Sequence, residues 1–207
     1  MTAKIVLPRL YPILDASCFA DDRALFQFAG DLFAAGVTLV QYRNKQGSTR
    51  QMLSHARELR RMAGTGAKLI MNDRADLCLA AGFDGVHVGQ DDLPPDAVRR
   101  IIGTQLWLGV STHNPEQLRE VDRTDADYVA IGPVFATGSK LNPDPVVGRE
   151  GVRAARAITR KPLVAIGGIT RANARSVIEA GADSVAVISD LLRDPRHAVE
   201  EFHALLG

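Results

Sequence analysis

The sequence has little of what marks a disulfide-rich, zinc-binding or nucleic-acid-binding protein. Its 207 residues include two cysteines, Cys18 and Cys78, with neither a CxxC nor a zinc-ligand spacing. We expect both thiols to be reduced, as is typical of a cytoplasmic protein. The formal charge of +1 at pH 7 gives no basic excess of the kind that binds nucleic acid or anionic membranes. We therefore expect no nucleic-acid or membrane partner.

Long apolar segments are missing as well. The N-terminal residues MTAKIVLPRLYPILD lack the apolar region of a signal peptide, and no segment approaches the roughly 20 apolar residues that cross a membrane. Hydrophobic residues make up 46% of the chain and charged residues 24%, which is ordinary for a globular protein. We expect a single domain over residues 1–207 with a cytoplasmic location, since this length can bury a core without disulfides or metals.

Eight short apolar runs alternate with segments of helical periodicity. Continuous apolar runs are typical of parallel strands that are covered on both faces. The runs are residues 11–15, 39–43, 68–72, 85–89, 107–111, 128–132, 163–167 and 184–189. Asn114-Pro115 offers a helix N-cap and a proline at the first helical position. The alternation predicts an α/β fold, a (β/α)8 TIM barrel, although a doubly wound sheet would give the same pattern with fewer units.

One predicted loop is longer than the others. Residues 132–148, GPVFATGSKLNPDPVVG, contain three prolines and no periodicity. Long loops in compact folds are usually functional or mobile, and we expect this one to be an active-site loop.

Polar residues follow most of the predicted strands at their carboxyl ends, where barrel enzymes place their active sites. The second strand ends in Gln41, Arg43 and Lys45, the third in Asn72 and Asp73, the fourth in Asp91 and Asp92, the fifth in Ser111 and His113, and the sixth leads to Thr137, Ser139 and Lys140. Gly167-Gly168 and Ser189 follow the last two strands, where a backbone can approach a phosphate closely. Acids together with cations on one rim are typical of a Mg²⁺-bound phosphate or pyrophosphate.

Each of these residues alone also has an ordinary structural explanation. Asp92 before Leu-Pro-Pro is equally well explained as an acid at a helix start, and Asn72-Asp73 as a capping pair. Lys140 alone would more often be a solvated loop lysine, and we interpret His113 as a loop or capping residue and His87 as a strand-interior residue. The shared position at consecutive strand ends favours a functional interpretation, since capping does not predict it.

These motifs in combination resemble the thiamine-phosphate synthase family. The resemblance runs from about Tyr11 to Leu192 through QYRNK, ND, GVHVGQDDLP, GVSTH, GPVFATGSK, AIGGI and GADSVAVIS, in order and spacing. It implies a transferase of thiamine biosynthesis, usually a homodimer, in which the thiazole nitrogen of hydroxyethylthiazole phosphate displaces Mg²⁺-bound pyrophosphate from hydroxymethylpyrimidine diphosphate. The product is thiamine phosphate.

The resemblance also implies a role for individual residues. Arg43, Lys45, Ser111 and Lys140 would be the catalytic set. Gln41, Arg43 and Lys45 would bind the pyrimidine diphosphate and Asn72 its phosphates; Asp73 and Asp92 would bind Mg²⁺; Ser111 and Lys140 would contact pyrophosphate; Thr137 and Ser139 would lie in the thiazole phosphate region; and Gly168, Ile188 and Ser189 would bind the thiazole phosphate. Asp91 would then have a structural role in the loop after the fourth strand.

Two other functions compete with the synthase. A related thiazole tautomerase would have a histidine where this chain has Pro133, and it tends to lose the acidic and basic pyrophosphate set. A non-catalytic phosphate-binding barrel would have no need to keep both metal acids and Lys140 together. Ala136 and Ser139 depart from the family's common Pro and Thr, and we expect altered packing there with the hydroxyl donor kept.

Overall fold

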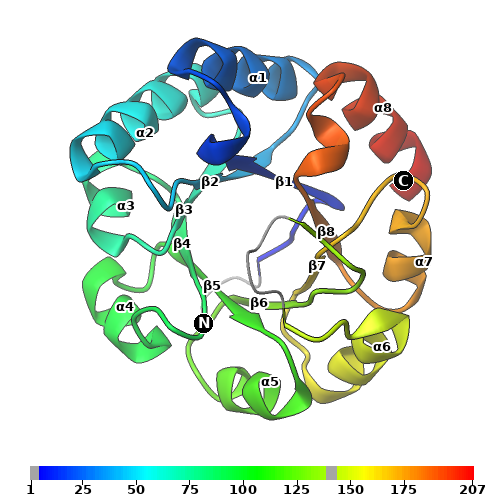
Figure 1. Ribbon diagram of the computed structural model, residues 1–207. Helices are drawn as coiled ribbons and strands as arrows, with labels where there is room; N and C mark the ends of the chain where they lie inside the picture. The colour runs from blue at the N-terminus through cyan, green and yellow to red at the C-terminus, as the bar shows by residue number, and fades with distance from the viewer. Residues whose placement is uncertain (1–4, 139–143) are drawn as a thin grey trace.

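The computed structural model describes residues 5–138 and 144–207, and within them the chain forms a closed barrel of eight parallel strands in sequential order, ringed by helices (Figure 1). The strands are β1 (Leu10–Asp15), β2 (Leu39–Arg43), β3 (Lys68–Asn72), β4 (Gly85–Val88), β5 (Trp107–Thr112), β6 (Tyr128–Ile131), β7 (Leu163–Ile166) and β8 (Ser184–Val187). The predicted (β/α)8 TIM barrel is confirmed, and the doubly wound alternative is wrong because β8 pairs with β1 and closes the sheet.

A helix follows each strand and packs on the outside of the barrel. The helices are α1 (Asp22–Ala34), α2 (Thr49–Ala63), α3 (Ala75–Ala81), α4 (Pro95–Ile102), α5 (Pro115–Asp122), α6 (Gly148–Ile158), α7 (Ala174–Glu179) and α8 (Pro195–Leu206). Two 3-10 turns, η1 (Ala16–Cys18) and η2 (Ser189–Leu191), follow β1 and β8. The predicted cap at α5 is present, since the Asn114 side chain accepts a hydrogen bond from the Gln117 backbone N–H.

Two apolar clusters explain why the strands are continuous apolar runs. The larger cluster lies between the strands and the surrounding helices and includes Leu14, Val40 and Leu108. The smaller one fills the barrel interior and includes Tyr11, Ile70, Tyr128, Ala130, Val164 and Ala186. Because successive strand residues face opposite sides, both sides of the sheet bury apolar surface.

The amino-terminal end of the barrel carries one ion-pair arrangement three times. An arginine in the last turn of a helix binds the aspartate that precedes the strand two positions further on in the barrel. The same aspartate carboxylate accepts a backbone N–H at 2.8 Å, from Leu69 at Asp84, from Leu108 at Asp127 and from Leu163 at Asp183. The pairs are Arg60–Asp84, Arg99–Asp127 and Arg156–Asp183, at 2.8, 2.7 and 2.9 Å. These three Arg–Asp pairs tie α2, α4 and α6 each to two strand starts.

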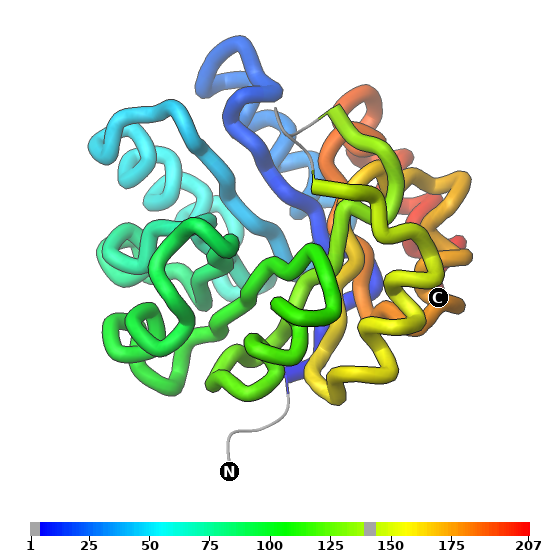
Figure 2. Tube along the Cα trace, turned by 60° about the horizontal axis from the view of Figure 1, so that its bottom comes forward, coloured from blue at the N-terminus to red at the C-terminus, as the bar shows by residue number. Residues whose placement is uncertain are grey.

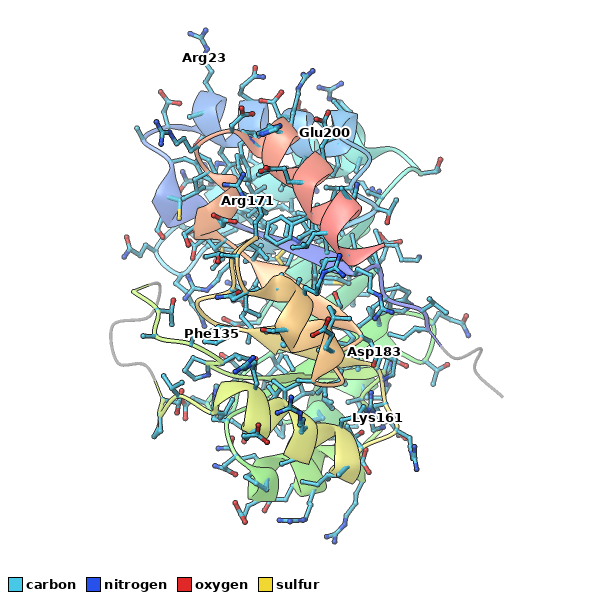
Figure 3. All side chains as sticks on the ribbon, turned by 90° about the vertical axis from the view of Figure 1, so that its right-hand side faces the viewer. Arg23, Phe135, Lys161, Arg171, Asp183 and Glu200 are labelled. Carbon is cyan, nitrogen blue, oxygen red and sulfur yellow. The ribbon has the colours of Figure 1, made fainter. Side chains whose placement is uncertain are left out.

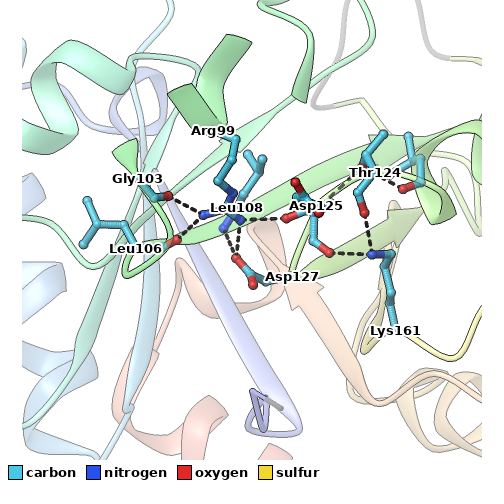
Figure 4. A network of polar contacts seen from close by, with 10 residues as sticks. Arg99, Gly103, Leu106, Leu108, Thr124, Asp125, Asp127 and Lys161 are labelled. Atoms are coloured by element: carbon cyan, nitrogen blue, oxygen red, sulfur yellow. Dashed lines mark hydrogen bonds and ion pairs between the residues drawn. The ribbon is translucent and has the colours of Figure 1, made fainter. Parts of the chain in front are cut away.

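The middle pair shows how many backbone groups such an arginine satisfies (Figure 4). Arg99 donates to the carbonyl oxygens of Gly103, Leu106 and Asp125 at 2.7–2.8 Å as well as to Asp127. Lys161 makes a parallel contact nearby, donating to the carbonyls of Thr124 and Ala126 at 2.8 Å. Loop carbonyls that would otherwise need water are thus paired within the protein.

The two ends of the barrel therefore differ in character. In Figure 2 the first described residues lie at the lower end of the barrel. The described residues of the loop that follows β6 lie at the upper end. Phe135 in that loop lies at one end of the molecule and Asp183 and Lys161 at the other (Figure 3). No helix in residues 5–138 and 144–207 is long and apolar enough to cross a membrane.

Candidate active site

A cavity of about 400 Å³ opens at the carboxyl ends of the strands. Its lining includes residues from most strand ends and from the loop after β6. Eleven of the thirteen predicted site residues line it: Gln41, Arg43, Lys45, Asn72, Asp73, Asp92, Ser111, Thr137, Gly168, Ile188 and Ser189. Ser139 and Lys140 lie outside the described residues. The structure thus brings these eleven residues together at one cavity.

Charged side chains gather on one side of this cavity, after β2, β3 and β4. Lys45 forms an ion pair with Asp73, and its ammonium nitrogen lies 4.0 Å from an Asp92 carboxylate oxygen. Arg43 forms an ion pair with Asp15, a buried carboxylate at the end of β1 that also accepts the Ser17 hydroxyl at 2.7 Å. Asp15 fixes the Arg43 guanidinium at the cavity wall, a role that the pattern of polar strand ends does not predict.

Asp73 has an unusual backbone that turns its carboxylate toward the cavity. Its φ of 61° lies in the left-handed region, where Asp and Asn are better tolerated than most residues. Burial raises the pKa of its carboxyl and the neighbouring Asp92 raises it further, while the hydrogen bond from Lys45 lowers it. Two acids that share a site beside one cation form a pocket suited to additional positive charge.

The two adjacent acids after β4 differ in their surroundings. Asp92 is half-buried, and its carboxylate accepts the backbone N–H of Gly89 at 2.8 Å. The N-cap of α4 is Pro94 and the acid in its first turn is Asp96, so Asp92 lies two residues before the cap and not within the helix start. Asp91 also lines the cavity but is exposed.

The glycine pair after β7 is required by a close approach of the chain to itself. Gly167 and Gly168 have φ values of 99° and 62°, and a Cβ atom on them would lie 2.6 Å from Pro133 and 2.5 Å from the Ala136 carbonyl oxygen. The neighbour is therefore the loop after β6, where the sequence suggested an anion. Both glycines nevertheless line the cavity and leave backbone exposed there.

A buried polar chain crosses the barrel beneath the cavity. Gln41 donates to the Tyr11 hydroxyl at 3.1 Å, the hydroxyls of Tyr11 and Tyr128 lie 3.0 Å apart, and Tyr128 lies 3.1 Å from Nδ1 of His87. Nε2 of His87 lies 2.8 Å from the Ser111 hydroxyl. Our interpretation of His87 as a strand-interior residue away from the rim missed that a barrel-facing strand position also lines the cavity.

His113, after β5, also lines the cavity and is held by the main chain. Its Nδ1 lies 2.6 Å from the Gly132 carbonyl oxygen, its backbone N–H donates to Gln117, and its Nε2 lies 3.5 Å from Asp144. Gln90 donates to the Ser111 carbonyl oxygen at 2.6 Å, which ties the loop after β4 to β5. The expected loop position of His113 agrees with these contacts.

The acidic pair is compatible with a divalent cation that shares its ligands with a substrate. Within the described part of the chain no three His, Cys, Asp or Glu side chains are grouped to hold a metal ion. Asp73 and Asp92 alone supply oxygen ligands of the type that Mg²⁺ prefers, and Mg²⁺ is commonly held by one or two carboxylates together with phosphate oxygens. The residues present therefore fit such an ion when a phosphorylated ligand is bound.

Comparisons with known proteins agree on one family. The family model for thiamine monophosphate synthase matches residues 10–191. Thiamine-phosphate synthase of Koribacter versatilis (strain Ellin345) is 60% identical over 209 residues, which cover 100% of this chain and 99% of the relative. Its namesake from Chloroflexus aurantiacus (strain ATCC 29366 / DSM 635 / J-10-fl) is 46% identical over 210 residues, with 99% and 95% covered.

A solved structure agrees with these sequence matches. Thiamine phosphate pyrophosphorylase from Pyrococcus furiosus superposes with a TM-score of 0.82 at 32% identity, covering 96% of this chain and 95% of that one. The family expected from the sequence motifs is thereby confirmed. Because the match extends over sequence, fold and nearly the full length, the chain belongs to the thiamine monophosphate synthase family.

Proposed function

We propose that this protein is a thiamine-phosphate synthase, a transferase that joins hydroxymethylpyrimidine diphosphate to hydroxyethylthiazole phosphate and releases pyrophosphate. The names of relatives that are 60% and 46% identical support the activity. The observation that carries it is the single cavity in which Arg43, Lys45, Asp73 and Asp92 meet, because a diphosphate leaving group needs cations beside it.

The arrangement suits a substitution that needs no protein base. The thiazole nitrogen already has its lone pair, and the pyrimidine methylene can carry positive charge as pyrophosphate leaves. Arg43, held by Asp15, and Lys45, held by Asp73, would stabilise the charge on the departing group, and Ser111 would donate a hydrogen bond to it. Lys140 is proposed for the same task. The protein thus orients two substrates and accepts leaving-group charge.

The remaining residues of the cavity would hold the two substrates in place. Gln41 and Asn72 are proposed to contact the pyrimidine diphosphate. On the other side Gly168, Ile188 and Ser189, with Thr137 and Ser139 from the loop at residues 132–148, are proposed to hold the thiazole phosphate. The place of Gly168 in the cavity lining supports this division, since a residue without a side chain lets a phosphate approach backbone N–H groups.

Mg²⁺ is the proposed cofactor, with Asp73 and Asp92 as its protein ligands. When bound, it would neutralise pyrophosphate charge and so make this group a better leaving group. Support comes from the two half-buried carboxylates that face the same lysine. We also propose a homodimer in the cytoplasm, where both phosphorylated substrates are retained because charged phosphates do not cross membranes freely.

The decisive experiment is a reconstitution with purified protein, Mg²⁺ and both phosphorylated substrates. We expect thiamine phosphate and pyrophosphate in equal amounts, and no product when Mg²⁺ is removed with a chelator. Isomerised thiazole phosphate without coupling would instead indicate a tautomerase. Binding of either substrate with no turnover would indicate the non-catalytic phosphate-binding barrel.

A further inference from the structure

The polar chain beneath the cavity has its shape because one glycine separates two rings. In the parallel register His87 on β4 lies beside Gly109 on β5, which lies beside Tyr128 on β6. A Cβ atom on Gly109 would lie 2.1 Å from the Tyr128 ring. With no side chain between them, the rings of His87 and Tyr128 approach to 5.6 Å between centroids. The contact between these two residues is therefore built into the strand register.

The donors and acceptors along this chain can all be satisfied in one direction. Gln41 donates through its amide nitrogen to the Tyr11 hydroxyl. In this direction Tyr11 gives its own proton to Tyr128 and Tyr128 gives its proton to Nδ1 of His87, so that each hydroxyl proton has an acceptor; the separations of 3.0 and 3.1 Å are equally compatible with the reverse order. A neutral His87 with an acceptor Nδ1 has its proton on Nε2, which faces the Ser111 oxygen at 2.8 Å. The Ser111 proton is thereby left for another acceptor.

We propose that Tyr11, Tyr128 and His87 are positioning residues, which keep Ser111 as a hydrogen-bond donor toward an anionic oxygen in the cavity. Ser111, Gln41 and His87 all line the cavity, whereas Tyr128 acts through its neighbours. The assignment of pyrophosphate as the acceptor rests on the proposed function. The proposed direction of hydrogen bonding does not, because it is argued from contacts within the protein alone.

Burial keeps the members of the chain in the required neutral forms. Tyr11, Tyr128 and His87 are almost fully buried. Burial of the His87 ring in the barrel interior favours its neutral form, because a charged imidazole would lose its hydration there. Desolvation also raises the pKa of both tyrosines, which keeps their hydroxyl protons in place. Hydrogen bonds buried in this way are expensive to break, so the order of donors should persist.

The tautomer of His87 tests this direction without any substrate. Nitrogen NMR of the labelled wild-type protein, assigned with a His87→Gln variant, should find His87 protonated on Nε2 and unprotonated on Nδ1. Protonation on Nδ1 would overturn the proposal, because Ser111 would then donate to the ring. Wild-type protein decides this point even if substitutions in the barrel interior prevent folding.

Tyr128→Phe removes the hydroxyl that fixes the ring, with Tyr42→Phe as the matched control. Tyr42 is also a buried strand tyrosine whose hydroxyl lies 2.8 Å from a histidine, His55, but it lies in the cluster outside the barrel. We expect Tyr128→Phe to mix the His87 tautomers and to weaken inorganic pyrophosphate binding in Mg²⁺ by about three- to tenfold, the loss of one net hydrogen bond. Tyr42→Phe should change neither.

The two readouts separate this proposal from the proposed function. An unchanged His87 tautomer and unchanged pyrophosphate affinity in Tyr128→Phe would overturn the positioning role. If wild-type protein forms no thiamine phosphate but His87 has the expected tautomer, the proposed function fails, whereas the proposed order of hydrogen-bond donors stands. Tyr11→Phe interrupts the same chain one step earlier and should give the same direction of change as Tyr128→Phe.

Discussion

Asp91 and Asp92 are chemically identical neighbours with different expected roles. Asp92 faces Lys45 and is held by Gly89, whereas Asp91 is exposed. We predict that Asp92→Asn lowers kcat/KM by about 100-fold or more, because it removes charge from the proposed cation site but can still accept from Gly89. Asp91→Asn should change kcat/KM little. Steady-state kinetics at several Mg²⁺ concentrations measure both, and equal losses would mean that the choice of Asp92 is wrong.

Asp73 combines a charge with a strained backbone, and two substitutions separate these properties. Asn tolerates the left-handed conformation, whereas Ala at φ 61° costs about 1–2 kcal/mol, or roughly 2–8 °C in Tm. We predict that Asp73→Asn loses activity without a change in Tm, and that Asp73→Ala loses both activity and stability. Thermal unfolding with parallel assays checks this. A large fall in Tm for Asp73→Asn would show that the Lys45 ion pair matters for folding.

At the residue scale, the sequence predicted side chains at strand ends better than side chains within strands. The shared position of the polar residues after β2, β3 and β4 predicted that they would meet, and the structure places them at one cavity. Asp15 and His87 were missed for a physical reason. Both occupy apolar strand runs, where the sequence does not say whether an alternate position faces the barrel interior or the helices.

The helices and strands are tied together at the amino-terminal end by the three Arg–Asp pairs. We predict that Asp127→Ala lowers the free energy of unfolding by about 1–3 kcal/mol, because it leaves Arg99 without its ion pair and the Leu108 N–H without its acceptor. Side chains of both partners are largely buried, at 12% and 25% exposure, so solvent screens the pair only in part. Urea denaturation followed by circular dichroism measures the change.

An exposed ion pair within one helix is the matched control for Asp127. Glu58 pairs with Arg61 on the surface of α2 and bonds no strand. Glu58→Ala should leave the denaturation midpoint nearly unchanged, since exposed ion pairs add little stability. If Asp127→Ala has no larger effect than Glu58→Ala, the three Arg–Asp pairs are not a source of stability.

At the scale of elements, the apolar runs predicted every strand, with small differences at the ends. Gly89, Gly132 and Gly167 were included in the predicted strands, yet β4, β6 and β7 each end one residue earlier. Glycine adopts conformations that leave the sheet, so it belongs to the following loop. The three Arg–Asp pairs went unnoticed because their partners lie 24–28 residues apart in sequence and no local periodicity links them.

Charged residues at the two ends of the barrel have different surroundings. At the carboxyl end Lys45 and two acids surround a cavity of about 400 Å³, an arrangement that favours ligands over stability. At the amino end similar residue types satisfy loop carbonyls and strand N–H groups. This division is general in barrels of this type, where loops at one end can change while the other end maintains the fold.

The stability of the whole molecule should fall in mild acid because His87 is buried in its neutral form. Its folded pKa is about 4, against about 6.5 for a free histidine. Above pH 6.5 neither state binds the proton; between 6.5 and 4 only the unfolded chain does. Unfolding therefore becomes easier as pH falls through this window, by roughly 2 kcal/mol at pH 5.

A His87→Gln variant isolates this contribution from the other titrating groups. The variant has no imidazole, so its free energy of unfolding should fall less between pH 7.5 and pH 5 than that of wild type, by roughly 2 kcal/mol. His203→Gln, an exposed position on α8, serves as control and should keep the wild-type slope. Chemical denaturation at both pH values gives the slopes. Parallel curves for wild type and His87→Gln would mean that the unfolded chain binds a proton at His87 no more readily than the folded protein does. The loss of stability in acid would then arise from other groups.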